Sequence, residues 1–174
     1  VSVMPMPAYL TIEGETQGLI TQGATTFESI TNEWQAGHED EIMVQAFSHS
    51  VITPRDPQSG NPTGTRIHQP FTFTCTLNKA VPLLYNALVT GELLTNVELK
   101  WYRTQASEQV HFFTTKLEEA LIVDVNCDMP HCKDLAFKDF TQLVEVKMTY
   151  RKIMWEHVVA GTSGSDDWRN PKQA

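Results

Sequence analysis

Residues 37–88, GHEDEIMVQAFSHSVITPRDPQSGNPTGTRIHQPFTFTCTLNKAVPLLYNAL, carry the signals of four successive elements. A short alternation of apolar and polar residues over 42–51 predicts a strand. Residues 53–65 hold three prolines and two glycines, which prevent either neighbouring strand from continuing into them. Phe71 and Phe73 then alternate with threonines, the period of two that is typical of a half-buried strand. An amphipathic helix follows, and none of these elements carries a recognisable catalytic motif.

The helix is expected over residues 78–91. Its predicted apolar face, with the spacing i, i+3, i+4 and i+7, consists of Val81, Leu84, Tyr85 and Leu88. We expect Asn78 to be the N-cap, Pro82 to lie in or next to the first turn, and Gly91 to end the helix in the left-handed conformation. A short helix with one apolar face has to pack against a sheet or close the end of a small barrel.

Alternation of apolar and polar residues dominates the rest of the chain. It appears over residues 8–12, 97–103, 110–117, 120–125 and 144–151. Many short strands with one helix favour a closed or nearly closed barrel, because closure removes exposed strand edges, although a sandwich would leave a similar pattern. We therefore expect a mainly β fold, a small β-barrel with one flanking α-helix.

The charge distribution argues against polyanionic partners. The net charge is −8, and residues 1–54 contain seven acidic residues and no lysine or arginine. Nucleic acids and anionic membranes require a basic surface, so neither is an expected partner. No apolar run approaches the roughly 20 residues of a membrane-spanning helix, and the first residues do not form a secretory signal. An acidic surface could meet a less acidic one on another copy, or could simply be solvated.

The residues that could carry chemistry do not form a known site. The sequence HEDE at 38–41 lacks the second histidine of a zinc-protease motif, because position 42 is isoleucine, and we expect a solvated turn. Cys127, His131 and Cys132 give three soft ligands where a structural zinc site needs four. We expect reduced thiols there, with a disulfide as the alternative, and Cys75 in the core. We expect no catalytic, cofactor-binding or metal site.

The quoted stretch resembles the Hcp (haemolysin-coregulated protein) family of the bacterial type VI secretion system, in its enterobacterial form. The resemblance continues in PAYLTIEGETQGLIT at 7–21, KWYRT at 100–104, HFFTTKL at 111–117, CDMPHC at 127–132 and YRKIMWEHVVAGTSGSDDW at 150–168. It implies a non-enzymatic subunit of which six copies close into a hexameric ring. Such rings stack into the inner tube of the secretion system.

The resemblance also implies partners and a location. They are neighbouring subunits, a spike protein at the tip of the tube, a contractile sheath around it and small effector proteins in the lumen. The protein would leave the bacterial cytoplasm folded, without a signal peptide, for the extracellular space or a target cell. Two alternatives from other classes remain open, a monomeric ligand-binding β-barrel and a hydrolytic enzyme that uses histidine and aspartate residues.

Expected boundaries and site residues complete the prediction. Residues 1–7 form an N-terminal segment in which Met4 is the expected natural start, 8–159 form the Hcp-like domain, and 160–174 form a flexible polar tail. The long loop is expected to serve assembly through Pro54, Arg55, Asp56, Pro57, Gly60, Pro62 and Gly64. Competing candidates for the lumen surface are the acidic residues Glu28 and Glu33 and the threonine face of Thr72, Thr74 and Thr76.

Overall fold

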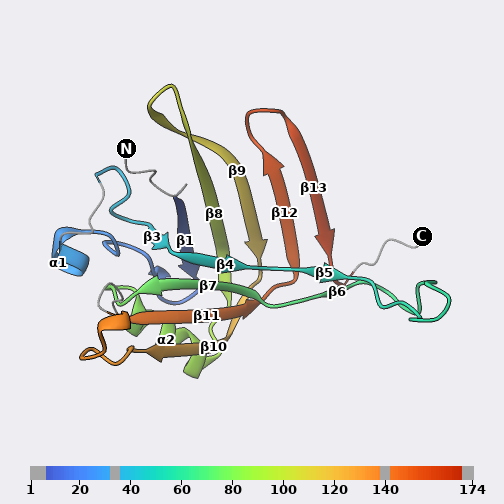
Figure 1. The fold of residues 1–174 in the computed structure, drawn as a ribbon, viewed down its shortest axis with the longest axis horizontal. Coiled ribbons are helices and arrows are strands. Elements are labelled where there is room, and N and C mark those ends of the chain that lie inside the picture. Colours follow the sequence, from blue (N-terminus) through green and yellow to red (C-terminus); the bar gives the residue numbers. More distant parts are fainter. Residues whose placement is uncertain (1–6, 32–35, 138–141, 170–174) are drawn as a thin grey trace.

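Two antiparallel sheets make up most of the computed structural model, which describes residues 7–31, 36–137 and 142–169 (Figure 1). The larger sheet contains β1 (Ala8–Gly14), β2 (Gly18–Leu19), β3 (Ile42–Val44), β8 (Leu94–Gln105), β9 (Glu108–Glu118), β12 (Lys152–His157) and β13 (Thr162–Asp167). The smaller sheet contains β4 (Ala46–Ser48), β7 (Phe71–Thr76), β11 (Leu143–Thr149) and β10 (Leu121–Asp128). The strands of the two sheets run across one another in Figure 1. The prediction of a mainly β fold is confirmed.

The chain passes between the sheets at corners, and within the described residues the hydrogen-bonded ladders do not close into a continuous barrel. At one corner the predicted strand 42–51 divides into β3, β4 and β5 (Val51–Ile52), and the Gln45 N–H donates to the Thr74 carbonyl at 2.8 Å. At another, Leu94 and Ala120 exchange backbone hydrogen bonds of 2.8 and 3.0 Å. Alternation alone did not show which strand edges pair, because sandwiches and barrels share that pattern.

One core lies between the sheets. Its largest fully buried side chains include Leu10, Ile12, Ile20, Ile42, Phe71, Phe73, Leu84, Leu94, Leu99, Leu117, Met148 and Ile153. They come from alternate positions of both sheets and from the helix. The inward positions of β7 and β11 are those predicted from alternation.

The helix α2 (Val81–Thr90) packs against β10, as its apolar face required. Gly91 follows it in the left-handed conformation with a φ of 65°, as predicted. The buried face consists of Val81, Leu84 and Ala87, whereas Tyr85 is 37% exposed, so its assignment to that face was wrong. The helix also begins later than predicted, because the Asn78 side chain accepts the Ala80 N–H in a turn before the helix. The shorter helices α1 (Phe27–Ile30) and η2 (Leu135–Phe137) were not predicted.

Glu92 connects the end of α2 to the turn between β1 and β2. Its carboxylate accepts the Thr16 N–H at 2.6 Å, the Gln17 N–H at 2.7 Å and the Gln17 Nε2–H at 2.6 Å. Burial opposes ionisation of this carboxyl, but the hydrogen bonds outweigh burial and hold the pKa of Glu92 below its usual value. Gly14 faces the same group, and a Cβ at that position would lie 2.9 Å from Oε2.

The C-terminal segment corrects the sequence-based boundary. Residues 160–174 were expected to form a flexible tail, but β13 pairs with β12 from His157↔Thr162 to Lys152↔Asp167. The Trp168 N–H then donates to the Arg151 carbonyl at 3.0 Å. Small polar residues form an edge strand here because β12 supplies the hydrogen bonds, and such a strand has no apolar alternation to reveal it. The expected boundary at residue 159 therefore falls within the β12–β13 turn.

Candidate functional site

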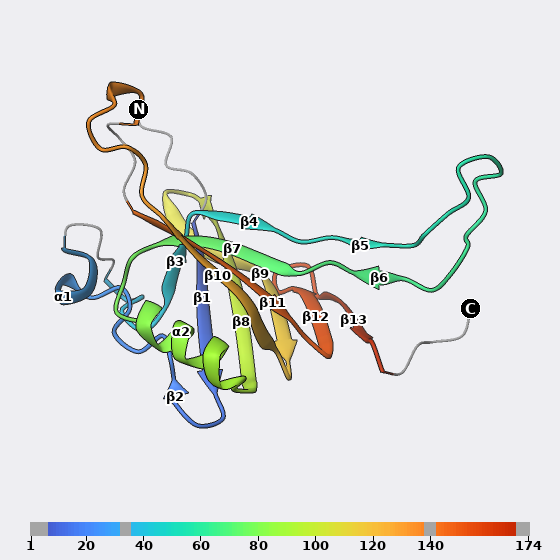
Figure 2. The ribbon, with the colours of Figure 1, turned by 90° about the horizontal axis from the view of Figure 1, so that it is seen from below.

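A hairpin that projects from the body is the most distinctive surface feature (Figure 2). We call residues 51–68 the projecting hairpin. Its strands β5 and β6 (Ile67–His68) pair in the register Val51↔His68 and Ile52↔Ile67. Beyond them the prolines and glycines end regular pairing, as predicted, apart from one isolated bridge between Arg55 and Pro62. β5 and β6 form a separate two-stranded sheet, so the hairpin extends away from both larger sheets.

Asp56 organises the tip of the projecting hairpin. Its carboxylate accepts the Gln58 N–H at 3.0 Å and the Ser59 hydroxyl at 2.9 Å. These hydrogen bonds, that from Gln58 first, hold the pKa of Asp56 below its usual value. Gly60 takes a φ of 73°, and its N–H donates to the Asp56 carbonyl at 2.8 Å. The tip is therefore a self-contained turn of the kind that aspartate and glycine favour.

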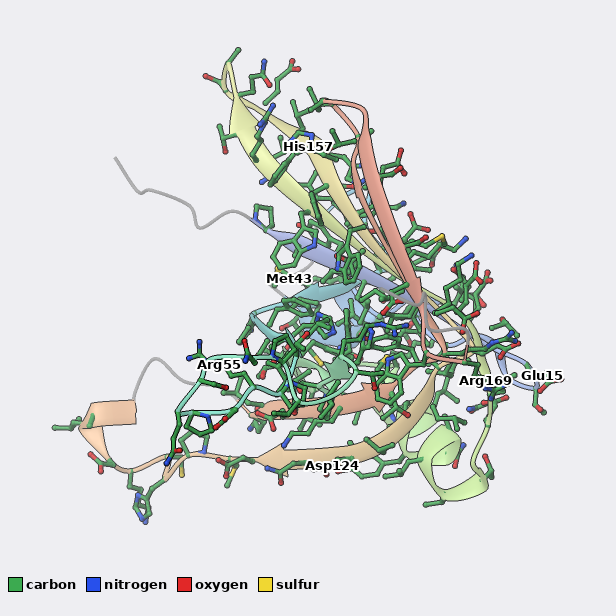
Figure 3. All side chains as sticks on the ribbon, turned by 90° about the vertical axis from the view of Figure 1, so that its right-hand side faces the viewer. Glu15, Met43, Arg55, Asp124, His157 and Arg169 are labelled. Atoms are coloured by element: carbon green, nitrogen blue, oxygen red, sulfur yellow. The ribbon has the colours of Figure 1, made fainter. Side chains whose placement is uncertain are left out.

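The projecting hairpin exposes apolar side chains. Val51, Ile52 and Ile67 are 40%, 47% and 43% exposed. A two-stranded hairpin is marginally stable on its own in water, and exposed β-branched residues on it are typical of a contact surface. Arg55, the first lysine or arginine of the chain, extends from the hairpin (Figure 3). All seven residues predicted for assembly lie on this segment.

The return strand of the projecting hairpin is attached to β13. Arg66 binds the Asp166 carboxylate through two nitrogens, with an Nη2–Oδ1 distance of 2.6 Å, and Nη2 also donates to the Asp167 carbonyl at 2.9 Å. His68 Nε2 lies 2.6 Å from the same carboxylate. Chiefly because of Arg66, the pKa of Asp166 falls to about 2. The carboxylate therefore stays charged at neutral pH and holds both residues.

Tyr150 connects the two ends of the projecting hairpin. Its hydroxyl lies 2.6 Å from His68 Nδ1 and 2.7 Å from Nε2 of His49, which lies two residues before the hairpin begins. Burial raises the pKa of Tyr150 and lowers the pKa of His49. We call the group of His49, Arg66, His68, Tyr150 and Asp166 the hairpin base. The sequence analysis missed it because its members are as much as 117 positions apart and share no local motif.

The two candidate lumen sets lie at different places. Glu28 is exposed on α1, beside the segment that joins β7 to α2, and Glu33 lies outside the described residues. Thr72 and Thr74 are half-buried on the outer face of β7, opposite Lys147 and Glu145 of β11. Thr76 is buried at 9% exposure. The outer face of the smaller sheet is therefore polar and carries both signs of charge.

His38 and Glu41 differ from the predicted solvated turn. The His38 ring stacks on Tyr9 with centroids 3.8 Å apart, and its Nδ1 lies 3.3 Å from Glu41 Oε2. The two side chains are only 18% and 17% exposed. The long-range partner Tyr9 explains the difference, because no local pattern around His38 indicates that β1 packs against this turn. The pair fastens the turn to β1.

The described residues offer no arrangement for metal binding, since they contain no group of three or more histidine, cysteine or acidic side chains placed to hold an ion. All three cysteines are free thiols, with Cys127 and Cys132 exposed and Cys75 buried. Burial raises the pKa of Cys75 to about 12, which makes its thiolate inaccessible near neutral pH. Among the described helices, none has the length and apolar character needed to cross a membrane.

Comparisons with known proteins give consistent results. A family model described as "Type VI secretion system effector, Hcp" matches residues 9–157. The chain is 56% identical over 169 residues to the "Major exported protein" of Pseudomonas aeruginosa, covering 97% of this chain and 98% of that protein. A crystal structure of an Hcp protein matches with a TM-score of 0.91 and 56% identity, over 95% of this chain and 99% of the other. The secreted protein Hcp3 from Pseudomonas aeruginosa matches with a TM-score of 0.80 and 49% identity, over 95% and 100%.

Proposed function

This chain belongs to the Hcp family of type VI secretion proteins, and from that premise we propose that it is a structural subunit of the secretion tube. Six copies close into a ring, and the rings stack to form the tube. Head-to-tail contacts between identical subunits either close into a ring or continue as a filament, so a tube subunit needs two complementary surfaces of its own. No reactive group is needed for this role.

The projecting hairpin is the observation that supports this proposal most directly. It exposes Val51, Ile52 and Ile67 outside the sheets, yet its base is fixed by charged and aromatic side chains. A segment that is held firmly at its base, with exposed apolar residues beside that base and a polar tip, is suited to contact a neighbouring copy. We propose that it reaches an adjacent subunit or the next ring, with Arg55 and the Asp56 turn at the contact.

We base the proposed cargo, partners and export of the protein on the same family membership. We propose that the tube carries small effector proteins in its lumen, lies within a contractile sheath and ends in a spike protein. Weak contacts repeated around a ring retain a cargo through avidity and still allow its release. Glu28 on α1 and the Thr72–Thr74 face of β7 remain the competing candidates for the lumen surface. We propose that the protein is exported folded, in keeping with the name of its relative, "Major exported protein".

The native mass of the protein tests the ring. Light scattering or native mass spectrometry should give a species of six times 19.7 kDa. A ring that dissociates on dilution would still support the proposal. A monomer at every concentration would overturn it and favour the alternative, a monomeric ligand-binding barrel.

A further inference from the structure

We propose that Asp166 is a positioning residue for assembly, because its carboxylate fixes the direction in which the projecting hairpin leaves the body. The attachment is a property of the single chain, whereas its effect on ring stacking rests on the proposed function. Asp166 lies on β13, 100 and 98 positions away from the two hairpin residues that it binds. The C-terminal strand, which the sequence predicted as a flexible tail, thereby contributes to assembly.

The backbone of the projecting hairpin does not by itself determine this direction. Among the described strands, β5 and β6 pair with each other and with no third strand. Each is two residues long, and a two-stranded hairpin is marginally stable in water unless it packs against another element. Side-chain contacts at the hairpin base are therefore needed to set the angle between the hairpin and the two larger sheets.

Asp166 binds the return strand of the projecting hairpin at two points. Its carboxylate binds two nitrogens of Arg66, with an Nη2–Oδ1 distance of 2.6 Å, and accepts a hydrogen bond from His68 Nε2 at 2.6 Å. Residues two positions apart in an extended strand lie on the same side of it, about 6.8 Å from one another. One contact would fix a point of the strand, but two contacts at this spacing also fix its direction.

The guanidinium group of Arg66 is fixed in orientation as well as in position. Its Nε and Nη2 bind the two oxygens of the Asp166 carboxylate side by side, and Nη2 also donates to the Asp167 carbonyl at 2.9 Å. Paired hydrogen bonds of this kind are charge-assisted and hold the planar group in one orientation. The side chains of Arg66 and Asp166 are 23% and 19% exposed, so salt screens this pair less than an exposed ion pair.

Asp166 is itself fixed to the core. It pairs with Ile153 in the ladder between β13 and β12, and Ile153 is fully buried. Paired residues of antiparallel strands point to the same face of a sheet, so Asp166 faces the side on which Ile153 is buried. There the Tyr150 hydroxyl lies 2.6 Å from His68 Nδ1, so the imidazole is held at both nitrogens. One carboxylate thus connects the projecting hairpin to the core through β13.

Limited trypsin digestion of the intact protein tests the attachment, because trypsin cuts after an arginine whose side chain is free to enter the protease. Arg66 is bound at the hairpin base, whereas Arg55 is exposed on the same hairpin and serves as the internal reference. In Asp166→Asn one carboxylate oxygen becomes an amide donor that opposes Arg66 or His68. Loss of one charged hydrogen bond should raise the detached population, and with it cleavage after Arg66, about tenfold. Cleavage after Arg55 should stay unchanged.

Asp167→Asn is the matched control. The Asp167 side chain lies 3.6 Å from Arg151 Nε and accepts the Arg169 N–H, whereas Arg66 uses the backbone carbonyl, which the variant keeps. Cleavage after Arg66 should therefore proceed at the wild-type rate. Equal cleavage after Arg66 in Asp166→Asn and in wild type would overturn the attachment, whatever the hairpin contacts.

Sedimentation of stacked rings tests the effect on assembly. We expect Asp166→Asn and Arg66→Gln each to reduce stacking, and the double variant to reduce it no further, because both changes remove the same attachment. Unchanged stacking in Asp166→Asn, although cleavage shows the hairpin detached, would overturn the positioning role. Replacing Asp56–Gly64 by a short Gly/Ser link then separates the two proposals. If that change abolishes stacking, the hairpin contact stands and positioning alone is refuted; if stacking persists, both are refuted.

Discussion

Replacing Glu92 by glutamine should destabilise the protein although its shape is retained. The variant keeps one carbonyl oxygen for the N–H groups of Thr16 and Gln17, but as a neutral acceptor. Its new amide group faces the Gln17 amide nitrogen, and Gln17 can relieve this clash of two donors only by turning its amide over, which gives up its 3.1 Å hydrogen bond to the Leu83 carbonyl. A hydrogen bond to a charged group contributes about 1.5–3 kcal/mol, and Glu92 accepts three such bonds, each of them partly buried. We expect a total loss of about 2–3 kcal/mol, because two of the bonds are weakened rather than removed.

Thermal unfolding at a fixed protein concentration measures this loss, since assembly also raises apparent stability. For a chain of 174 residues the melting temperature should fall by about 5–10 °C. Because the pKa of Glu92 lies below its usual value of 4.5, the ionised carboxylate stabilises the fold above that pH. The difference between wild type and variant should therefore be complete above pH 4.5 and should shrink as the pH falls further.

Glu15→Gln is the matched control, because Glu15 lies on the same turn but its side chain is exposed. It should change the melting temperature by no more than a typical surface substitution, within about 0.5 kcal/mol. Equal melting temperatures for Glu92→Gln and wild type would refute the reasoning. A difference that persists unchanged at pH 3 would refute the assignment to the ionised carboxylate.

Three further predictions concern the hairpin, the thiols and the cargo. Replacing Asp56–Gly64 by a short Gly/Ser link should leave the circular dichroism of the sheets intact and reduce ring stacking and secretion; unchanged stacking and secretion would make the segment a spacer. The double variant Cys127→Ser/Cys132→Ser should melt close to wild type because both side chains are exposed, and native mass spectrometry should find no zinc; unfolding by a chelator would contradict this. Charge reversal by Glu28→Lys should lower co-purification of a cognate effector while the native mass stays that of the ring. If the ring itself is lost, Glu28 belongs to a subunit interface, and if neither changes, it faces outward.

Local periodicity predicted the elements whose burial follows their own sequence. β7 was found because Phe71 and Phe73 are buried between threonines, and α2 because Gly91 and Pro82 mark its ends. The same reasoning misplaced Tyr85, because the fully buried residues are Val81, Leu84 and Ala87, three positions apart, whereas the prediction continued from Leu84 to Tyr85 and Leu88. The spacing of apolar residues therefore predicts which side of a helix is buried, but it does not settle which residues at the margins of that side are buried.

Long-range partners account for what the sequence did not show. β13 has no alternation of its own and depends on β12 for its hydrogen bonds. The hairpin base joins His49, His68, Tyr150 and Asp166, whose proximity results from the packing of separate strands. The long loop was predicted from its prolines and glycines, yet nothing in those residues indicated where its ends are attached. Its proposed role in assembly remains a prediction.

β10 is an edge strand of the smaller sheet, and its shape affects whether other copies of the chain can add a strand to that edge. β10 exposes Leu121 and Val123 at 39% and 48%, and its pairing with β11 shifts register between Ile122 and Asp124. A flat apolar edge strand invites indiscriminate addition of further strands, and a bulge of this kind interrupts the regular row of donors and acceptors that such addition needs. Amyloid-like growth from this edge is thereby disfavoured, and copies of the chain are less prone to add to one another strand by strand at this position.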